Sequence, residues 1–179
     1  MFRRAGIPVI DADLVSRKVS APGGRAYSSI VLEFGDGILL ADGHIDRKKL
    51  GGIVFSDPAR RKRLEALTHP AILETVRKYL GKLSESGCSA AMVEASLIHE
   101  SGVKEMFDAI VLVRCNEETQ IWRVMDRDKI SRDEALSRIG AQMNANLKAF
   151  AADHVIDNSG SIEDTRAQVE SIAQILRGL

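Results

Sequence analysis

Two carboxylates one residue apart are the side chains of this sequence best suited to chemistry. Asp11 and Asp13 follow the apolar residues Val9 and Ile10, which indicate a short buried strand, and a helical pattern follows at once. Acids at the carboxyl end of a strand in an α/β protein lie where ligands bind, in the crevice beyond the strand ends. One carboxylate could accept a proton from a substrate hydroxyl, and the other could orient a basic group or a hydrated metal ion. The structural alternative is that one of them caps the following helix.

Basic residues on two predicted helices and the connection between them form a second candidate site. They are Arg123, Arg127, Lys129, Arg132 and Arg138. Guanidinium groups folded over a crevice can bind phosphoryl oxygens through paired hydrogen bonds and stabilise developing charge. The alternative is a solvated face on which these bases pair with Asp126, Asp128 and Asp133.

Three further polar positions are candidates, each with a structural alternative. Glu94 lies in or at the end of an apolar segment, where an unpaired charge is costly, so it either serves a polar site or occupies an exposed strand end. His69 precedes Pro70, which should bend or break a helix and turn the imidazole toward another face. Residues 157–160 are typical of a turn, which could place backbone groups beside a flat ring such as adenine.

Strands separated by helices are expected to position these groups. Residues 90–96 and 109–113 are apolar segments that indicate strands buried on both faces, as in a parallel sheet covered by helices, and residues 154–157 indicate a last strand. The alternation predicts a doubly wound α/β fold, which by itself names no function.

Capping residues mark the ends of the predicted helices. A long helix is expected from Pro58 to about Leu83, with Ser56 as its cap. Asn116 and Ser131 are expected to cap two further helices. Residues 162–176 are expected to form an amphipathic helix. Residues 1–6 resemble the last turn of a helix closed by a glycine, which suggests that the chain starts late in its fold.

Composition and charge narrow the function classes. The 179 residues are 45% hydrophobic and 28% charged, with 25 basic and 25 acidic residues, so no global field favours nucleic acid or a membrane surface as a partner. We expect neither a signal peptide nor a membrane span. The two cysteines, Cys88 and Cys115, have no metal-ligand spacing, which favours a reduced, cytoplasmic protein.

Taken together, these segments resemble the dephospho-CoA kinase family over nearly the whole chain. Each match is weak alone, and their order and spacing make the resemblance specific. The matching segments are residues 6–13, 64–72, 97–100, 118–120, 127–128, 138–142 and 152–160.

The resemblance implies a fold and a reaction. The fold is that of P-loop kinases similar to nucleoside-monophosphate kinases: one domain over residues 1–179, with a helical substrate-binding region at 22–88 and a lid at 124–150. The reaction is ATP- and Mg²⁺-dependent phosphorylation of the ribose 3′-hydroxyl of dephospho-CoA, the last step of coenzyme A synthesis. Such phosphoryl transfer needs mostly positioning and charge neutralisation.

The resemblance also assigns residues. Asp13 corresponds to the acid that faces the 3′-hydroxyl, with Asp11 beside it. The other assignments are Arg17, His69, Glu94 and Glu100 to substrate binding, Arg127 and Arg138 to the lid over the ATP phosphates, and Asn158 and Gly160 to the turn near the adenine.

The sequence departs from the family pattern at three points. Ser96 replaces a usual proline, and His99 replaces an apolar or aromatic residue. More importantly, the sequence contains no G-x-x-x-x-G-K-[ST] phosphate loop, which in the family follows a first strand and supplies backbone N–H groups, a lysine and a Mg²⁺-binding hydroxyl. We therefore expect an N-terminally truncated, inactive form, with the strand and loop encoded within roughly twenty to thirty codons upstream of Met1.

Two alternative functions stay open. The first is another nucleotide or nucleoside-monophosphate kinase of the same architecture, which would place phosphate-binding arginines opposite the ATP. The second is a non-catalytic protein that binds ligands similar to coenzyme A.

Overall fold

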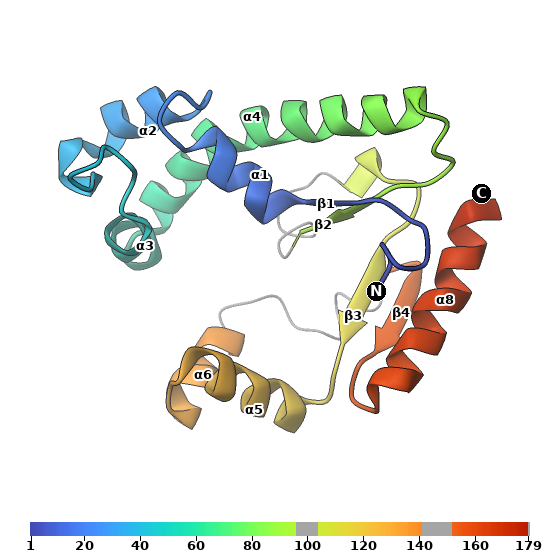
Figure 1. Cartoon of the computed structure of the whole chain (residues 1–179). Coiled ribbons are helices and arrows are strands. Elements are labelled where there is room, and N and C mark those ends of the chain that lie inside the picture. The colour runs from blue at the N-terminus through green and yellow to red at the C-terminus, as the bar shows by residue number, and fades with distance from the viewer. Residues whose placement is uncertain (96–103, 141–151, 179) are drawn as a thin grey trace. The chain divides into compact units, whose positions relative to one another are not determined.

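The computed structural model describes residues 1–95, 104–140 and 152–178 (Figure 1). The chain divides into two compact units. We call Pro8–Ala95 the helical unit, and Met1–Ile7 together with Ser96–Leu179 the terminal unit.

The helical unit begins and ends with short strands that pair in parallel. Strands β1 (Val9–Asp11) and β2 (Met92–Glu94) align so that Ile10 lies opposite Val93 and Asp11 lies opposite Glu94. The elements between them are α1 (Ala12–Val19), α2 (Tyr27–Phe34), the 3₁₀ turn η1 (Asp36–Ile38), α3 (Arg47–Ser56) and α4 (Pro58–Glu85).

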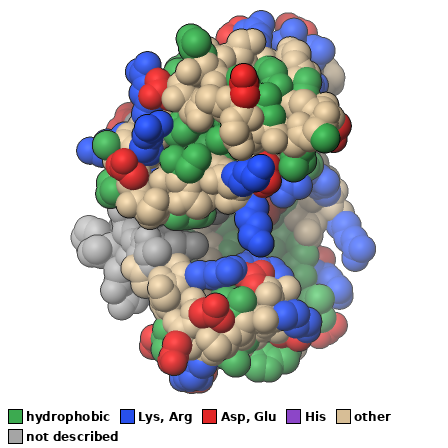
Figure 2. All heavy atoms as spheres, turned by 90° about the vertical axis from the view of Figure 1, so that its left-hand side faces the viewer, with side chains coloured by type: hydrophobic (Ala, Val, Ile, Leu, Met, Phe, Trp, Pro, Cys, Tyr) green, Lys and Arg blue, Asp and Glu red, His purple; other side chains and the backbone are tan. Residues whose placement is uncertain are grey.

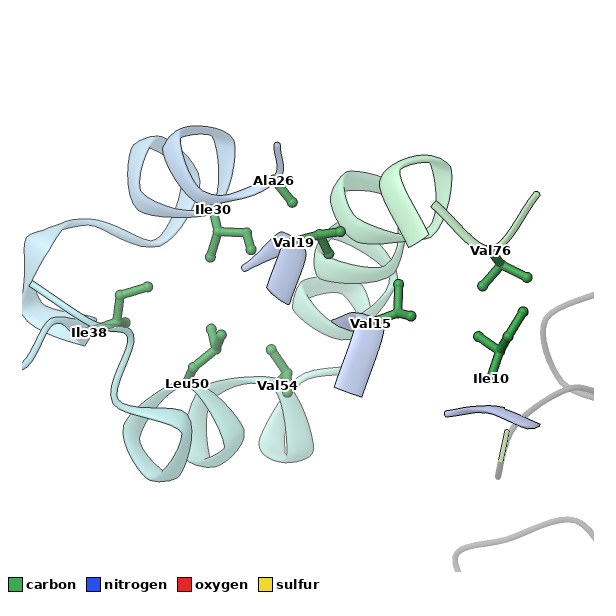
Figure 3. Close-up of a cluster of buried hydrophobic side chains, with 9 residues drawn as sticks. All are labelled: Ile10, Val15, Val19, Ala26, Ile30, Ile38, Leu50, Val54 and Val76. Atoms are coloured by element: carbon green, nitrogen blue, oxygen red, sulfur yellow. The ribbon is translucent and has the colours of Figure 1, made fainter. Parts of the chain in front are cut away.

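A core of aliphatic side chains holds the helices of this unit together. Val15 and Val19, one turn apart on α1, belong to the same buried cluster as Leu50 and Val54 of α3 (Figure 3). Ile30 of α2 is 1% exposed within it. Burying such side chains contributes roughly 1.5–3 kcal/mol each, which fixes α1, and with it the start of the helix after β1.

Helix α4 differs from the sequence prediction at two points. Its cap is Asp57, whose Oδ1 accepts hydrogen bonds from the N–H groups of Ala59 (2.8 Å) and Arg60 (3.2 Å), and the prediction of Ser56 is wrong because Ser56 is the last residue of α3. The helix also continues through Pro70 instead of breaking there. The proline removes one backbone hydrogen bond, but buried side chains on both sides of it, Thr68 and Val76, pack into the unit and hold the helix.

The terminal unit contains the second parallel pair of strands. Strands β3 (Val111–Arg114) and β4 (His154–Asp157) align so that Arg114 lies opposite Asp157. The other elements are the 3₁₀ turn η2 (Lys104–Met106), α5 (Glu117–Asp128), α6 (Arg132–Gly140) and α8 (Ile162–Gly178).

Helix starts in this unit follow the predicted capping residues. Asn116 Oδ1 accepts a hydrogen bond from the Thr119 N–H at 2.8 Å. Ser131 and Glu134 exchange the two hydrogen bonds of a capping box, at 3.0 and 3.3 Å. Both predicted caps are confirmed.

The strands are less buried than the sequence predicts. Residues of β2 are half-buried or exposed, and Val113 of β3 is 55% exposed. The expectation of burial on both faces is therefore wrong for the described residues, in which each of these strands has a single partner strand.

The residues before β1 form a helix-ending turn. Gly6 has a φ of +82°, and its N–H donates to Arg3 O at 3.2 Å while the Ile7 N–H donates to Phe2 O at 3.1 Å. This pair of bonds is the Schellman motif, and the buried side chains of Phe2 and Ile7 accompany it. The predicted glycine-closed turn is confirmed.

None of the helices in the described ranges combines the length and apolar character that a bilayer crossing requires.

Candidate functional site

The acids predicted at the end of the first strand lie at one edge of the β1–β2 pair. Asp11 and Glu94 are the last residues of their strands and are directly opposite in the register. Because the strands are parallel, their carboxyl ends meet at the same edge of the sheet. Backbone pairing, not a side-chain contact, therefore brings these two residues together.

Asp11 and Asp13 have different surroundings. Asp11 caps α1, because its Oδ1 accepts a hydrogen bond from the Leu14 N–H at 3.0 Å. Asp13 lies in the first turn of α1, is exposed, and accepts no hydrogen bond from any described residue. The capping role foreseen for one of the two thus belongs to Asp11, and the Asp13 carboxylate is available to a ligand.

Two arginines are electrostatic neighbours of Asp13. Arg17 lies one helical turn after it on α1, and Arg47 is the first residue of α3. Arg47 is an exposed residue, but partial desolvation of its guanidinium lowers its pKa, the nearby charge of Arg17 lowers it further, and Asp13 acts in the opposite direction. Among the described residues neither arginine has an ion-pair partner within 4 Å, so this group carries an excess positive charge beside Asp13.

Arg47 is a member of this group that no sequence motif predicts. It follows the helix cap Asp46 by one residue, and nothing local marks it as functional. Its neighbourhood depends on the shared core of α1 and α3, which joins residues about thirty positions apart.

The remaining substrate-binding predictions are not joined to this acidic edge by described contacts. His69 lies within α4 and is half-buried, with no hydrogen bond or ion pair to Asp11, Asp13 or Glu94 among the described residues. Glu100 lies outside the described residues, as do Ser96 and His99.

In the terminal unit, Arg127 and Arg138 converge on one carboxylate. Arg127 donates through Nε to Asp128 Oδ1 at 2.7 Å and through Nη2 to Oδ2 at 3.0 Å. Arg138, ten residues after Asp128, donates through Nη1 to Asp128 Oδ2 at 2.6 Å. The guanidinium of Arg127, and secondarily that of Arg138, holds the pKa of Asp128 below its ordinary value.

Two further bases of the predicted cluster form separate ion pairs, and Arg123 has no ion-pair partner within 4 Å among the described residues. Lys129 donates to Asp126 at 2.8 Å, and Arg132 donates to Glu118 at 2.6 Å. The predicted alternative, a solvated face on which the bases pair with nearby acids, therefore describes the segment well. Asp126 and Asp128 are predicted partners, whereas Glu118, the partner of Arg132, was not predicted. Acidic and basic side chains are interspersed on the face drawn in Figure 2.

The turn after β4 is held by hydrogen bonds to the end of β3 and the start of α8. The Asn158 N–H donates to Arg114 O at 2.7 Å, and Asn158 Oδ1 accepts from Thr165 Oγ1 at 3.0 Å. A Cβ on Gly160 would lie 3.0 Å from a carboxylate oxygen of Asp164, so a larger residue there would push against that side chain. The turn is a fixed surface at the carboxyl ends of two parallel strands, where nucleotides bind in such folds.

The described residues include no group of three or more His, Cys, Asp or Glu side chains arranged to hold a metal ion. Magnesium usually keeps several waters and takes one or two carboxylates plus substrate phosphates. Carboxylate oxygens at the β1–β2 edge fit that pattern, because they supply hard ligands without forming a complete cage.

Comparison with known proteins gives one consistent family. The dephospho-CoA kinase family model matches residues 1–164. A curated dephospho-CoA kinase of Geobacter sulfurreducens is 46% identical over 172 residues, which are 96% of this chain and 87% of that protein. The dephospho-CoA kinase of Symbiobacterium thermophilum is 42% identical, over 96% of this chain and 72% of that protein.

Solved structures agree with the sequence comparison. Dephospho-CoA kinase from Campylobacter jejuni matches with a TM-score of 0.70 and 30% identity, over 98% of this chain and 88% of that one. The crystal structure of TT1252 from Thermus thermophilus matches with a TM-score of 0.79 and 30% identity, over 99% and 87%. The predicted α/β fold of the P-loop kinase kind is thereby confirmed.

Proposed function

This chain belongs to the dephospho-CoA kinase family, and we propose that it carries the acceptor side of the reaction that this name describes. The reaction is transfer of a phosphoryl group from ATP to the ribose 3′-hydroxyl of dephospho-CoA, which yields coenzyme A and ADP. The observation that carries the proposal is the available Asp13 carboxylate beside the Asp11–Glu94 edge, with Arg17 and Arg47 as its charged neighbours.

Asp13 is the proposed general base. It accepts the proton of the 3′-hydroxyl as the oxygen attacks the terminal phosphorus of ATP, and the bond from that phosphorus to the bridging oxygen of ADP breaks. Asp11 fixes the start of α1 through its cap and so sets the direction of Asp13. This division of labour matches the different surroundings of the two acids.

Arg17 and Arg47 are proposed to bind the anionic part of the acceptor. Dephospho-CoA carries a diphosphate next to the ribose that is phosphorylated. Two guanidiniums without a described ion-pair partner near Asp13 supply the charge that such a group needs. His69, Glu94 and Glu100 stay proposed substrate-binding residues, within a helical substrate-binding region at residues 22–88.

The donor side is proposed to use the terminal unit. Arg127 and Arg138, within a lid over residues 124–150, would contact the ATP phosphates, and Asn158 and Gly160 would lie near the adenine. Magnesium, when bound, neutralises charge on the transferring phosphoryl group, and the carboxylates at the β1–β2 edge are the described residues that would hold it. We also propose that turnover needs a phosphate loop, a motif that this sequence does not contain.

Calorimetry and a coupled kinase assay test the proposal together. We expect the chain to bind dephospho-CoA, and to phosphorylate it only when a G-x-x-x-x-G-K-[ST] loop segment is placed ahead of Met1. Preference for AMP or CMP as acceptor would favour a nucleoside-monophosphate kinase instead. Binding of dephospho-CoA without turnover, even with the loop supplied, would favour the non-catalytic alternative.

A further inference from the structure

Asp128 is shared by two arginines, whereas the other ion pairs of the α5–α6 segment in the described chain join one base to one acid. Its side chain is 20% exposed, and those of Arg127 and Arg138 are 74% and 58% exposed. The three charges sum to one positive charge, located between the end of α5 and the last turn of α6.

Stability alone does not account for this arrangement. Exposed ion pairs contribute little to stability, and two guanidiniums held at one carboxylate repel each other. The connection also includes Lys129, the one non-glycine residue with positive φ in the described ranges, at 54°. That conformation ends α5 and lets the chain turn into α6, whose Arg138 comes back to Asp128.

The hydrogen bonds leave most guanidinium donors unused. Each arginine has five N–H groups, of which Arg127 gives two and Arg138 one to Asp128. Both arginine side chains stay largely exposed to solvent. A polyanion that approaches this cluster meets two guanidiniums that are already held in place. The two arginine side chains therefore lose less conformational entropy when the polyanion binds.

We propose that Asp128 is a positioning residue that gathers Arg127 and Arg138 into one binding site for the phosphate chain of the donor. The assignment of the donor rests on the proposed function. The role of Asp128 in gathering the two arginines rests on the hydrogen bonds of the terminal unit.

The direction in which Asp128→Asn changes the affinity for a polyanion distinguishes the positioning role of Asp128 from a purely electrostatic effect. Asp128→Asn removes a negative charge beside two arginines, so electrostatics alone predicts that it strengthens polyanion binding. The positioning role predicts about tenfold weaker binding of tripolyphosphate and of ATP. The reason is that the neutral amide no longer attracts both guanidiniums as a charged acceptor does. Trp122, the single tryptophan of the sequence, lies on α5 at 65% exposure and provides the fluorescence titration signal, with calorimetry as the second readout.

Asp126→Asn is the matched control. It makes the same chemical change two residues earlier on the same helix, where the carboxylate pairs with Lys129 alone. We expect unchanged or slightly tighter tripolyphosphate binding for this variant, partial recovery of affinity for Asp128→Glu, and weakened binding for Arg127→Ala and for Arg138→Ala. Circular dichroism melts should show midpoints within about 2 °C of the parent for both Asp→Asn variants, since these pairs are exposed.

Two outcomes would overturn the inference: tripolyphosphate binding by Asp128→Asn that equals or exceeds that of the parent chain, or parent binding that neither arginine variant reduces. Titration with dephospho-CoA in the same variants keeps the two proposals apart. If the parent chain fails to bind dephospho-CoA while the Asp128 effect on tripolyphosphate persists, the acceptor assignment fails and the positioning role stands.

Discussion

The acids of the helical unit and the arginines of the terminal unit are held in place by different parts of the chain. Asp11 and Glu94 are opposite because the backbones of β1 and β2 pair in that register. Arg127 and Arg138 are together because both donate to the side chain of Asp128. One arrangement is set by the main chain, and the other by a single carboxylate.

This difference predicts how each region responds to substitution. Where the backbone sets the geometry, replacing a functional side chain removes its chemistry and leaves its neighbours in place. Where side chains hold each other, replacing one of them moves the others, so the effects of two substitutions are not additive.

The largest expected effect is that of Asp13→Asn on turnover. In the form that carries a phosphate loop, we expect kcat to fall at least about 100-fold, the usual loss for a general base, with a modest change in ATP affinity. Folding should be unchanged, because the Asp13 carboxylate accepts no hydrogen bond from the described residues. Steady-state kinetics with a thermal melt checks this, and full activity in the variant would move the base role to Asp11.

Next in size is the coupling between Arg127 and Asp128. Arg127→Ala should weaken ATP binding by about tenfold while the free energy of unfolding changes by less than about 1 kcal/mol, as for other exposed pairs. In a double-mutant cycle, Arg127→Ala with Asp128→Asn should lose less affinity than the two single losses added together. Loss of stability without loss of affinity would instead make the pair structural.

The acidic edge of the helical unit and the helix starts of the terminal unit follow from local sequence. A strand that ends in Asp11, a helix that starts there, and caps at Asn116 and Ser131 depend on nearest neighbours in the chain, and the structure confirms them. The error at Ser56 is of the same local kind: Ser and Asp both cap helices, and the adjacent Asp57 takes the position.

Contacts between distant residues were harder to predict. Arg47 approaches Asp13 and Arg17 only because α3 and α1 share a core. The choice of Asp128, and not Asp126 or Asp133, as the partner of two arginines depends on how the chain turns at Lys129. Neither of these contacts can be predicted from residue spacing within one helix. The residue types indicate which side chains could bind a ligand, and the tertiary fold determines which of them lie together.

A smaller effect on stability distinguishes the helix-capping role of Asp11 from the role of its charge. Asparagine caps helices about as well as aspartate, so Asp11→Asn should keep the stability of the parent, while Asp11→Ala should lose about 1 kcal/mol. Urea unfolding of both variants measures this. If the asparagine variant also loses dephospho-CoA phosphorylation in the loop-bearing form, the carboxylate has a chemical role besides the cap. Equal stability of all three proteins would show that backbone pairing alone fixes the start of α1.

The smallest expected effect is the pH dependence of the Asp128 contribution to stability. The pKa of Asp128 in the folded protein lies below its ordinary value of 3.8, because Arg127 and Arg138 favour the charged carboxylate. The folded state therefore binds fewer protons than the unfolded chain at acid pH, so stability falls as the pH falls. The difference in melting temperature between the parent and Asp128→Asn should be constant above pH 3.8 and shrink as the pH drops through the lower folded-state pKa. Added salt should reduce the same difference, because both guanidiniums are exposed to solvent. A difference that grows toward acid pH would contradict a carboxylate held in its charged form by two arginines.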